Sequence, residues 1–245
     1  MPDWRDADDY RFTDGLTRDQ WGWEFLRRNP DYQREWARFD ALWRALEADY
    51  GRAPNRDFHA WKRDPRAYVV VAEDEAGDGC RIDQDRVLIE CALGARWGFY
   101  KFPLSPDTDN PLPPERLAWR EQPSRVRRLT GSDSGYLGDD PARIALGFDL
   151  DLPLRDQLEQ AKRYLLARQQ RLRREGRLQM RTVAKLREDW RLALRLLDAE
   201  AAGVSLDEIA GTLFGGDTET ARHGLEEARR LRDGGYLEIV KLPEG

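Results

Sequence analysis

The chain has 245 residues, of which 36% are charged and 40% hydrophobic, and its net charge is −5. This length suits one large domain or two small ones, and the longest strongly apolar run, AYVVVA, is far too short to span a bilayer. Two cysteines, Cys80 and Cys91, and an acidic N-terminus without an apolar segment predict a cytoplasmic protein with neither a secretory signal nor a disulfide framework.

Residues 1–65 are rich in tryptophan and carry the start signals of successive helices. Thr17 with Gln20 is a capping box, and Asn29 before Pro30 predicts the start of a second helix. Large apolar side chains recur at helical spacing along that helix: Tyr32, Trp36, Phe39, Trp43, Leu46 and Tyr50. So wide an apolar face must be covered, and we expect the middle of the chain to cover it, with another protein as the alternative.

Residues 66–152 change to short β-type segments separated by turn sequences. The segments are AYVVVA, RVLIECAL, WGFYKFPL, RLAWRE and ARIALGFDL. No helical pattern separates them, which argues against a parallel βαβ fold and a Rossmann-type cofactor domain. The pattern predicts a small antiparallel sheet or barrel.

Residues 153–245 are predicted to form a helical domain that begins with a basic, amphipathic helix. Its apolar stripe comprises Leu154, Leu158, Ala161, Leu165 and Leu172. Between Lys162 and Arg187 the chain carries ten basic residues and one acidic residue, Glu175. Such a local excess of positive charge can bind phosphate whatever the total charge, although a solvated helix face is the usual role of a charge run.

Residues 186–242 have the pattern of three helices and a short strand. Gly203 ends the first helix, Ser205 with Glu208 is a capping box for the second, and Asp217 or Thr218 caps the third. The run YLEIVKL then predicts a strand. Two helices joined by a tight turn and followed by a strand are the outline of a helix-turn-helix with one wing.

The third helix carries the side chains that would contact DNA. Its candidate DNA-binding residues are Thr218, Thr220, Arg222, His223, Arg229 and Arg230. The basic region before it would add phosphate contacts from Arg171, Arg174, Arg181 and Arg187. Carboxylates repel phosphate, so Glu219, Glu226 and Glu227 favour the alternative of a plain polar outer face.

Catalytic, metal and cofactor sites are not expected. His59 and His223 are the only histidines, and neither lies at ligand spacing from a cysteine. Asp107 and Asp109 lack the other ligands of a calcium loop, and no G-x-S-x-G or phosphate-loop motif is found. We therefore expect a protein that is not an enzyme.

Two parts of the chain resemble a known family. PDWRDADDYRF with DQWGWEFLRRNPDY is similar to the transcriptional-regulator-like domain at the start of many proteobacterial proteins. A second resemblance is to the family's C-terminal type VI secretion-type transcription-factor domain, a divergent helix-turn-helix, and is carried by RLALRLLDAEAAGVSLDEIAGTLFG and LRDGGYLEIV. The segment that precedes this domain in the family is similar to FDLDLPLRDQLEQAKRYL. The resemblance covers roughly the first 65 and the last 100 residues.

The resemblance implies a transcriptional regulator. Some relatives activate genes for excision and transfer of integrative conjugative elements, and others act as antiactivators by binding a partner protein. The region between GTLFG and GGY is shorter and less basic here than the family's usual recognition region, which keeps the second role open.

These observations together predict an α+β protein that regulates transcription by binding double-stranded DNA. The alternative is a protein-interaction module that acts on a transcription complex without contacting DNA. A regulatory protein and a second copy of the chain are the further partners to consider.

Overall fold

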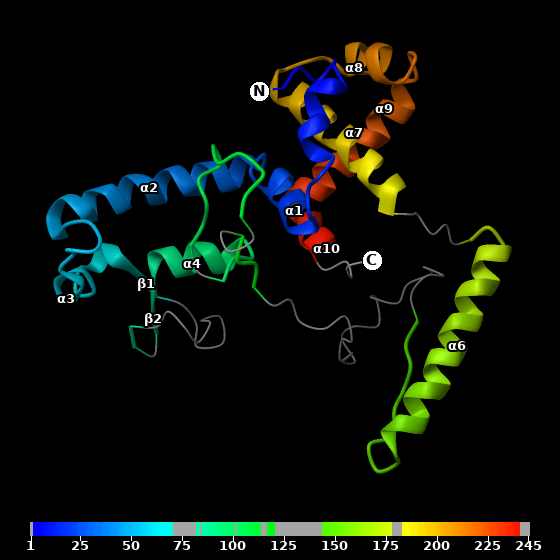
Figure 1. Cartoon of the computed structure of the whole chain (residues 1–245), viewed down its shortest axis with the longest axis horizontal. Coiled ribbons are helices and arrows are strands. Elements are labelled where there is room, and N and C mark those ends of the chain that lie inside the picture. The colour runs from blue at the N-terminus through cyan, green and yellow to red at the C-terminus, as the bar shows by residue number, and fades with distance from the viewer. Residues whose placement is uncertain are drawn as a thin grey trace. The chain divides into compact units, whose positions relative to one another are not determined.

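The structure is a computed structural model that describes residues 2–70, 82–83, 85–100, 102–113, 117–120, 144–177 and 183–240. The chain divides into two compact units, which Figure 1 shows in the colours of the sequence. Unit 1 comprises residues 1–122 and 187–245, and unit 2 comprises residues 123–186. Unit 1 therefore contains elements from both ends of the chain. The sequence-based limits 1–65, 66–152 and 153–245 stay a prediction.

The first 67 residues form helices, as predicted. They are η1 (Asp8–Thr13), α1 (Arg18–Leu26), α2 (Pro30–Tyr50), α3 (Phe58–Trp61) and η2 (Pro65–Ala67). The capping box before α1 is confirmed, because the Thr17 and Gln20 side chains each accept a hydrogen bond from the other's backbone N–H. Asn29 caps α2 by accepting from the backbone N–H groups of Asp31 and Tyr32.

The middle of the chain contains less sheet than the sequence predicts. Strands β1 (Tyr68–Val70) and β2 (Arg86–Leu88) pair antiparallel, with Val69 opposite Val87. The rest of RVLIECAL is not strand but helix α4 (Ile89–Arg96), which corrects the prediction. Short apolar runs of this kind do not distinguish a buried helix from a buried strand.

The other three predicted strands do not form in the described residues. WGFYKFPL and RLAWRE meet only in an isolated antiparallel bridge between Phe99 and Trp119. The described part of ARIALGFDL, residues 144–150, belongs to no strand. Within the described ranges the sheet therefore has two strands, and the predicted barrel is absent.

The C-terminal part is helical, and its predicted wing is wrong. It contains α6 (Leu154–Arg174), α7 (Val183–Ala201), α8 (Leu206–Leu213), α9 (Thr218–Arg230), the kinked segment η5 (Leu231–Gly235), in which Gly234 has a positive φ angle of 146°, and α10 (Tyr236–Val240). YLEIV forms α10 because Tyr236 and Ile239, one helical turn apart, are both buried. Lys241 and Leu242 lie outside the described residues.

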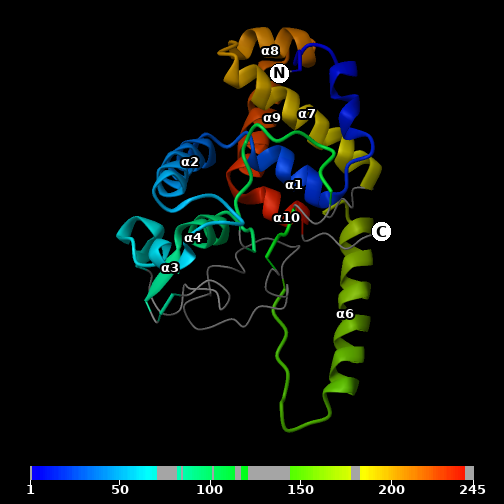
Figure 2. The ribbon, with the colours of Figure 1, turned by 60° about the vertical axis from the view of Figure 1, so that its left-hand side comes forward.

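Helix α1 lies in the core of unit 1 and packs against α10 (Figure 2). Trp21, Trp23 and Phe25 are fully buried. A Cβ atom on Gly22 would lie 2.6 Å from Cγ2 of Val240, so only glycine lets the two helices approach this closely.

A second buried cluster lies along α2. Leu46 of α2 packs with Trp61, Ala67 and Ile89, and Phe39, Leu42, Trp43, Tyr50 and Leu88 surround them. Residues from the middle of the chain, Ala67, Leu88 and Ile89, thus cover part of the aromatic stripe of α2 together with Trp61, while Trp36, Phe39, Trp43 and Tyr50 stay half-buried.

Candidate functional site

The predicted DNA-reading region forms two helices joined by a four-residue turn, Phe214 to Asp217. Gly215 and Gly216 adopt positive φ angles of 60° and 93°, which favour glycine and reverse the chain sharply. Asp217, and not Thr218, caps α9 by accepting from two backbone N–H groups. Ala221, Leu225 and Ala228 form the buried face of α9. The two helices and the turn between them agree with the prediction, whereas the strand predicted as the wing is helix α10.

The outer face of α9 is exposed, and its three arginines are paired with carboxylates of the protein. Thr218 is half-buried, whereas Thr220, Arg222, His223, Arg229 and Arg230 are exposed. Arg222 pairs with Glu219, and Arg229 pairs with Glu200 of α7. Arg230 pairs with Glu227 at 2.8 Å and with Glu238 at 3.0 Å, and Thr220 Oγ1 donates to Asp217 at 2.6 Å.

This surface is acidic in sum. From Ser205 to Arg230 the acidic residues are Asp207, Glu208, Asp217, Glu219, Glu226 and Glu227, against the three arginines Arg222, Arg229 and Arg230. A phosphate would therefore have to replace a carboxylate at each arginine.

The other predicted phosphate contacts come from a different part of the chain. Arg171 and Arg174 lie on the last turn of α6, where Arg171 Nε is 3.5 Å from a carboxylate oxygen of Glu175. Arg187 is half-buried on α7, and Arg181 lies outside the described residues. Because α6 belongs to unit 2 and α9 to unit 1, a single basic face formed by both stays a prediction.

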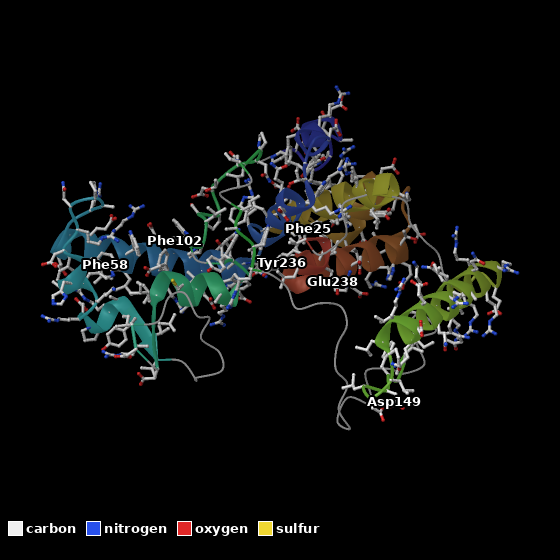
Figure 3. The ribbon with its side chains drawn as sticks, turned by 60° about the horizontal axis from the view of Figure 1, so that its bottom comes forward. Phe25, Phe58, Phe102, Asp149, Tyr236 and Glu238 are labelled. Carbon is white, nitrogen blue, oxygen red and sulfur yellow. The ribbon has the colours of Figure 1, made fainter. Side chains whose placement is uncertain are left out.

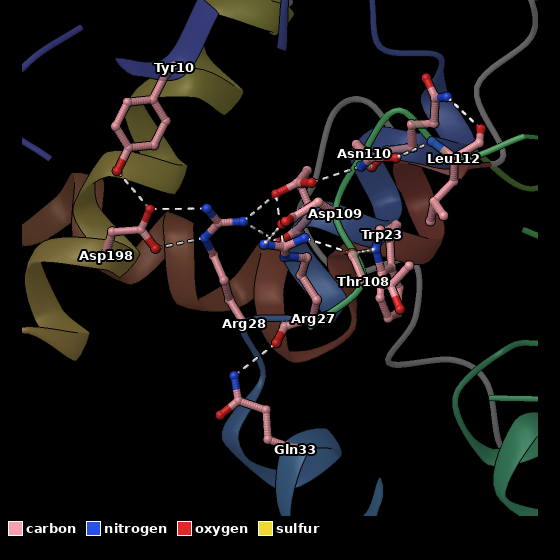
Figure 4. Close-up of polar contacts among 12 residues, drawn as sticks. Tyr10, Trp23, Arg27, Arg28, Gln33, Thr108, Asp109, Asn110, Leu112 and Asp198 are labelled. Atoms are coloured by element: carbon pink, nitrogen blue, oxygen red, sulfur yellow. Dashed lines mark hydrogen bonds and ion pairs between the residues drawn. The ribbon is translucent and has the colours of Figure 1, made fainter. Parts of the chain in front are cut away.

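A buried ion pair joins the two sequence-distant halves of unit 1 (Figure 4). Arg28, which follows α1, donates from Nε and Nη2 to the two carboxylate oxygens of Asp198 on α7, at 2.7 and 3.0 Å. Its Nη1 donates to Glu24 at 2.5 Å, and the hydroxyl of Tyr10 donates to Asp198 at 2.6 Å. The Arg28 and Asp198 side chains are only 11% and 4% exposed.

Neighbouring polar residues extend this network to the loop before Trp119. Asn110 donates from Nδ2 to Glu24 at 2.8 Å. Arg27 donates to the carbonyl oxygen of Thr108 at 2.7 Å and to Asp109 at 2.8 Å. Asp109, which the sequence places in an incomplete calcium-loop pattern, thus binds an arginine.

The polar residues of the W-E-F-L-R-R-N-P-x-Y string therefore act as anchors inside unit 1. Asn29 Nδ2 donates to Asp233 of η5 at 3.1 Å, and the hydroxyl of Tyr32 donates to the carbonyl oxygen of Leu104 at 2.5 Å. Together with Glu24, Arg27 and Arg28, these side chains bind partners on α7, on η5 and in the loop at 104–110.

Two members of this network, Arg28 and Tyr10, have raised pKa values. Burial alone would lower the pKa of Arg28, but hydrogen bonds to Asp198 and the charges of Asp198 and Glu24 raise it overall. Burial, followed by the hydrogen bond to Asp198, raises the pKa of Tyr10 well above its usual range. Arg28 therefore stays a cation and Tyr10 a neutral donor.

Sequence reasoning missed this network, although one signal was present. Asp198 lies one residue after Leu197 and four after Leu194, so it falls on the buried face of α7. An acidic residue on an apolar stripe needs a buried partner. The sequence does not show which of the many arginines supplies it.

Other classes of site find no support in the described residues. In those ranges no group of three metal-ligating side chains comes together, and no helix is long and apolar enough to cross a membrane. Cys91 is disulfide-bonded, which corrects the expectation that the chain has no disulfide; Cys80 lies outside the described residues.

Comparison with known proteins gives a partial identification. Neither the curated proteins nor the solved structures contain a match to the chain. The part that is matched runs from the start of the chain to β1 and includes η1, α1 and α2. Residues 3–69 match the family described as the proteobacterial transcriptional regulator-like domain.

Proposed function

We propose that the protein is a transcriptional regulator that binds double-stranded DNA through α9. The observation that carries this proposal is a pair of helices joined by a tight glycine turn, whose second helix has an exposed polar face. It occurs in a chain whose residues 3–69 match a transcriptional regulator-like domain.

In this proposal α9 enters the major groove with its N-terminal half. Arg222 is placed to donate to a guanine, and Thr218 and Thr220 to contact a phosphate or a thymine methyl group. Arg229 and Arg230, on the last turn, would contact the DNA backbone.

The charge balance determines how such binding would respond to salt. The carboxylates around α9 weaken the attraction to phosphate, and in this proposal the basic region that includes α6 adds phosphate contacts. That helix carries seven basic residues, Arg155, Lys162, Arg163, Arg168, Arg171, Arg173 and Arg174, against Asp156 and Glu159. If about six phosphates are neutralised, affinity should fall by orders of magnitude between low and physiological ionic strength.

The test is a binding titration of genomic DNA fragments at several salt concentrations. Replacing Arg222 and Arg229 with alanine should weaken binding by about 1–3 kcal/mol at a preferred sequence. Arg44→Ala with Arg52→Ala, which removes two exposed arginines near and after the end of α2, is the matched control and should leave binding unchanged. Absence of any salt-sensitive DNA binding by the purified chain would contradict the proposal.

A second candidate function is a protein-interaction module of the antiactivator type. The specific observation in its favour is that Arg222, Arg229 and Arg230 are all paired with carboxylates on an acidic surface. A partner protein that binds at one-to-one stoichiometry after nuclease treatment, and is lost on Arg222→Glu, would support it. A DNA mobility shift by the purified chain alone would favour the first proposal.

A further inference from the structure

The described part of unit 2 leaves most of its apolar side chains on the surface. Within residues 144–177, Leu172 is the only buried side chain. The exposed apolar side chains are Ile144, Leu146, Phe148, Leu150, Leu152, Leu154, Leu158, Tyr164, Leu165 and Leu166. A segment this short with so little core usually needs a partner to fold.

Two elements present these side chains side by side. Residues 144–152 run alongside α6 in Figures 1 and 2, and in the view of Figure 3 Asp149 marks the bend between them. The Gln157 side chain fixes this bend, since it accepts from the backbone N–H of Asp149 and donates to its carbonyl oxygen, both at 2.8 Å.

The segment at 144–148, before the bend, has the pattern of an unpaired strand. Its residues Ile144, Leu146 and Phe148 are apolar at every second position, which places these side chains on one face of an extended chain. Residues 144–150 are in no sheet, so their backbone groups form no ladder with another described segment. Such an edge favours pairing with another strand.

The exposed leucines of α6 form a stripe. Leu154, Leu158 and Leu165 recur at the spacing of one helix face, and Leu158 is 56% exposed. Leu166 is similarly exposed but lies about 100° further round the helix. A strand edge and a helix stripe in one short segment require a partner that offers both a strand and an apolar helix.

The charges of this segment are opposite at its two ends, which favours a second copy of the chain as the partner. The end nearer residue 149 carries Asp149, Asp151, Asp156 and Glu159 against Arg155. From Ala161 to Arg174 there are six basic residues and no acidic one: Lys162, Arg163, Arg168, Arg171, Arg173 and Arg174. The two ends are therefore complementary to each other when one segment lies antiparallel to an identical one.

We propose that residues 144–174 form an antiparallel homodimer interface. A two-fold axis pairs the extended residues 144–148 with their counterpart and packs the leucine stripe of α6 against its counterpart. Two-fold pairing is the commonest form of assembly among soluble oligomers. The proposal does not depend on DNA binding.

The first test is sedimentation of the nuclease-treated full chain over a range of concentrations. The wild-type chain should form dimers, and Leu158→Glu with Leu165→Glu should weaken dimerisation at least about a hundredfold, because it places charges in the apolar contact. Leu166→Glu is the matched control, with one added charge off the stripe, and should leave the dimer intact.

The second test distinguishes antiparallel from parallel pairing. Replacing Arg171, Arg173 and Arg174 with glutamate should weaken the dimer, because like charges then face each other across the axis. Adding Asp149→Lys, Asp151→Lys and Asp156→Lys to the same chain reverses both ends and should restore dimerisation. In a parallel pair the first set would have little effect, and the second would restore nothing.

Three results would overturn the proposal. The first is a chain that stays monomeric at hundreds of micromolar, well above the range of specific dimers. The second is a dimer whose affinity the Leu158→Glu, Leu165→Glu variant leaves unchanged, because the stripe is then outside the interface. The third is a dimer that this variant and Leu166→Glu weaken equally.

Discussion

Replacing Asp198 with alanine should destabilise unit 1 more than any surface substitution. Asp198 accepts two hydrogen bonds from Arg28 and one from Tyr10. Each hydrogen bond to a charged group contributes about 1.5–3 kcal/mol, but these values do not add within one network. Glu24 still neutralises Arg28 after the substitution, which limits the loss.

Removing one partner of a buried ion pair typically costs about 3–5 kcal/mol, and because Glu24 stays paired with Arg28 we expect a decrease at the lower end of this range in the free energy of unfolding. Solvent offers little compensation, because the Arg28 and Asp198 side chains are 11% and 4% exposed. Arg28→Met with Asp198→Leu should not recover the loss, since Glu24, whose side chain is 1% exposed, then loses its Arg28 partner.

Urea unfolding followed by tryptophan fluorescence measures the free energy of unfolding of unit 1. All nine tryptophans of the chain belong to unit 1. Glu219→Ala is the control, because it breaks an ion pair whose side chains are 52% and 82% exposed and should cost less than about 1 kcal/mol. A loss below about 1 kcal/mol for Asp198→Ala would refute the reasoning.

Three further predictions concern the packing and burial of unit 1. Gly22→Ala should destabilise unit 1 by about 1–3 kcal/mol in the same urea assay, because the alanine Cβ would lie 2.6 Å from Cγ2 of Val240. Adding Val240→Ala to the same chain should relieve much of this loss. Burial raises the pKa of Glu90, whose Oε2 has no hydrogen-bond partner, so the folded state favours the protonated acid. Glu90→Gln should therefore stabilise the protein by about 1–3 kcal/mol at pH 7. When unfolding is measured at successive pH values, this gain should vanish as the pH falls below the ordinary pKa of a glutamate. An unchanged gain at low pH would contradict the idea that the buried charge of Glu90 causes the effect. Residues 3–69 expressed alone should fail to give dispersed NMR signals, because Trp21 would lose Trp190 and Arg28 would lose Asp198, both on α7. A well-folded fragment would contradict the anchoring role of the network.

Features encoded by neighbouring residues were predictable from the sequence. The Thr17–Gln20 box and the Asn29 cap depend on contacts within three residues, and both are confirmed. The same holds for the glycine turn between α8 and α9. These elements need no knowledge of the rest of the fold.

Features decided by distant contacts were not predictable. YLEIV has the composition of a strand, but packing of Tyr236 and Ile239 in the core of unit 1 favours a helix. Arg28 and Asp198 are 170 residues apart, and no spacing rule links them. The motif around Arg28 was therefore recognisable as a family resemblance, while its physical role required the three-dimensional contacts.

The discontinuity of unit 1 has a consequence for its synthesis. Arg28 leaves the ribosome 170 residues before Asp198, and at about 5–20 residues per second that interval is roughly 10–30 s. During this time the tryptophans of α1 have been translated but the helices that cover them have not. A growing chain in this state offers a large apolar surface to chaperones, so the demand for chaperone protection should be greatest before α7 to α10 emerge.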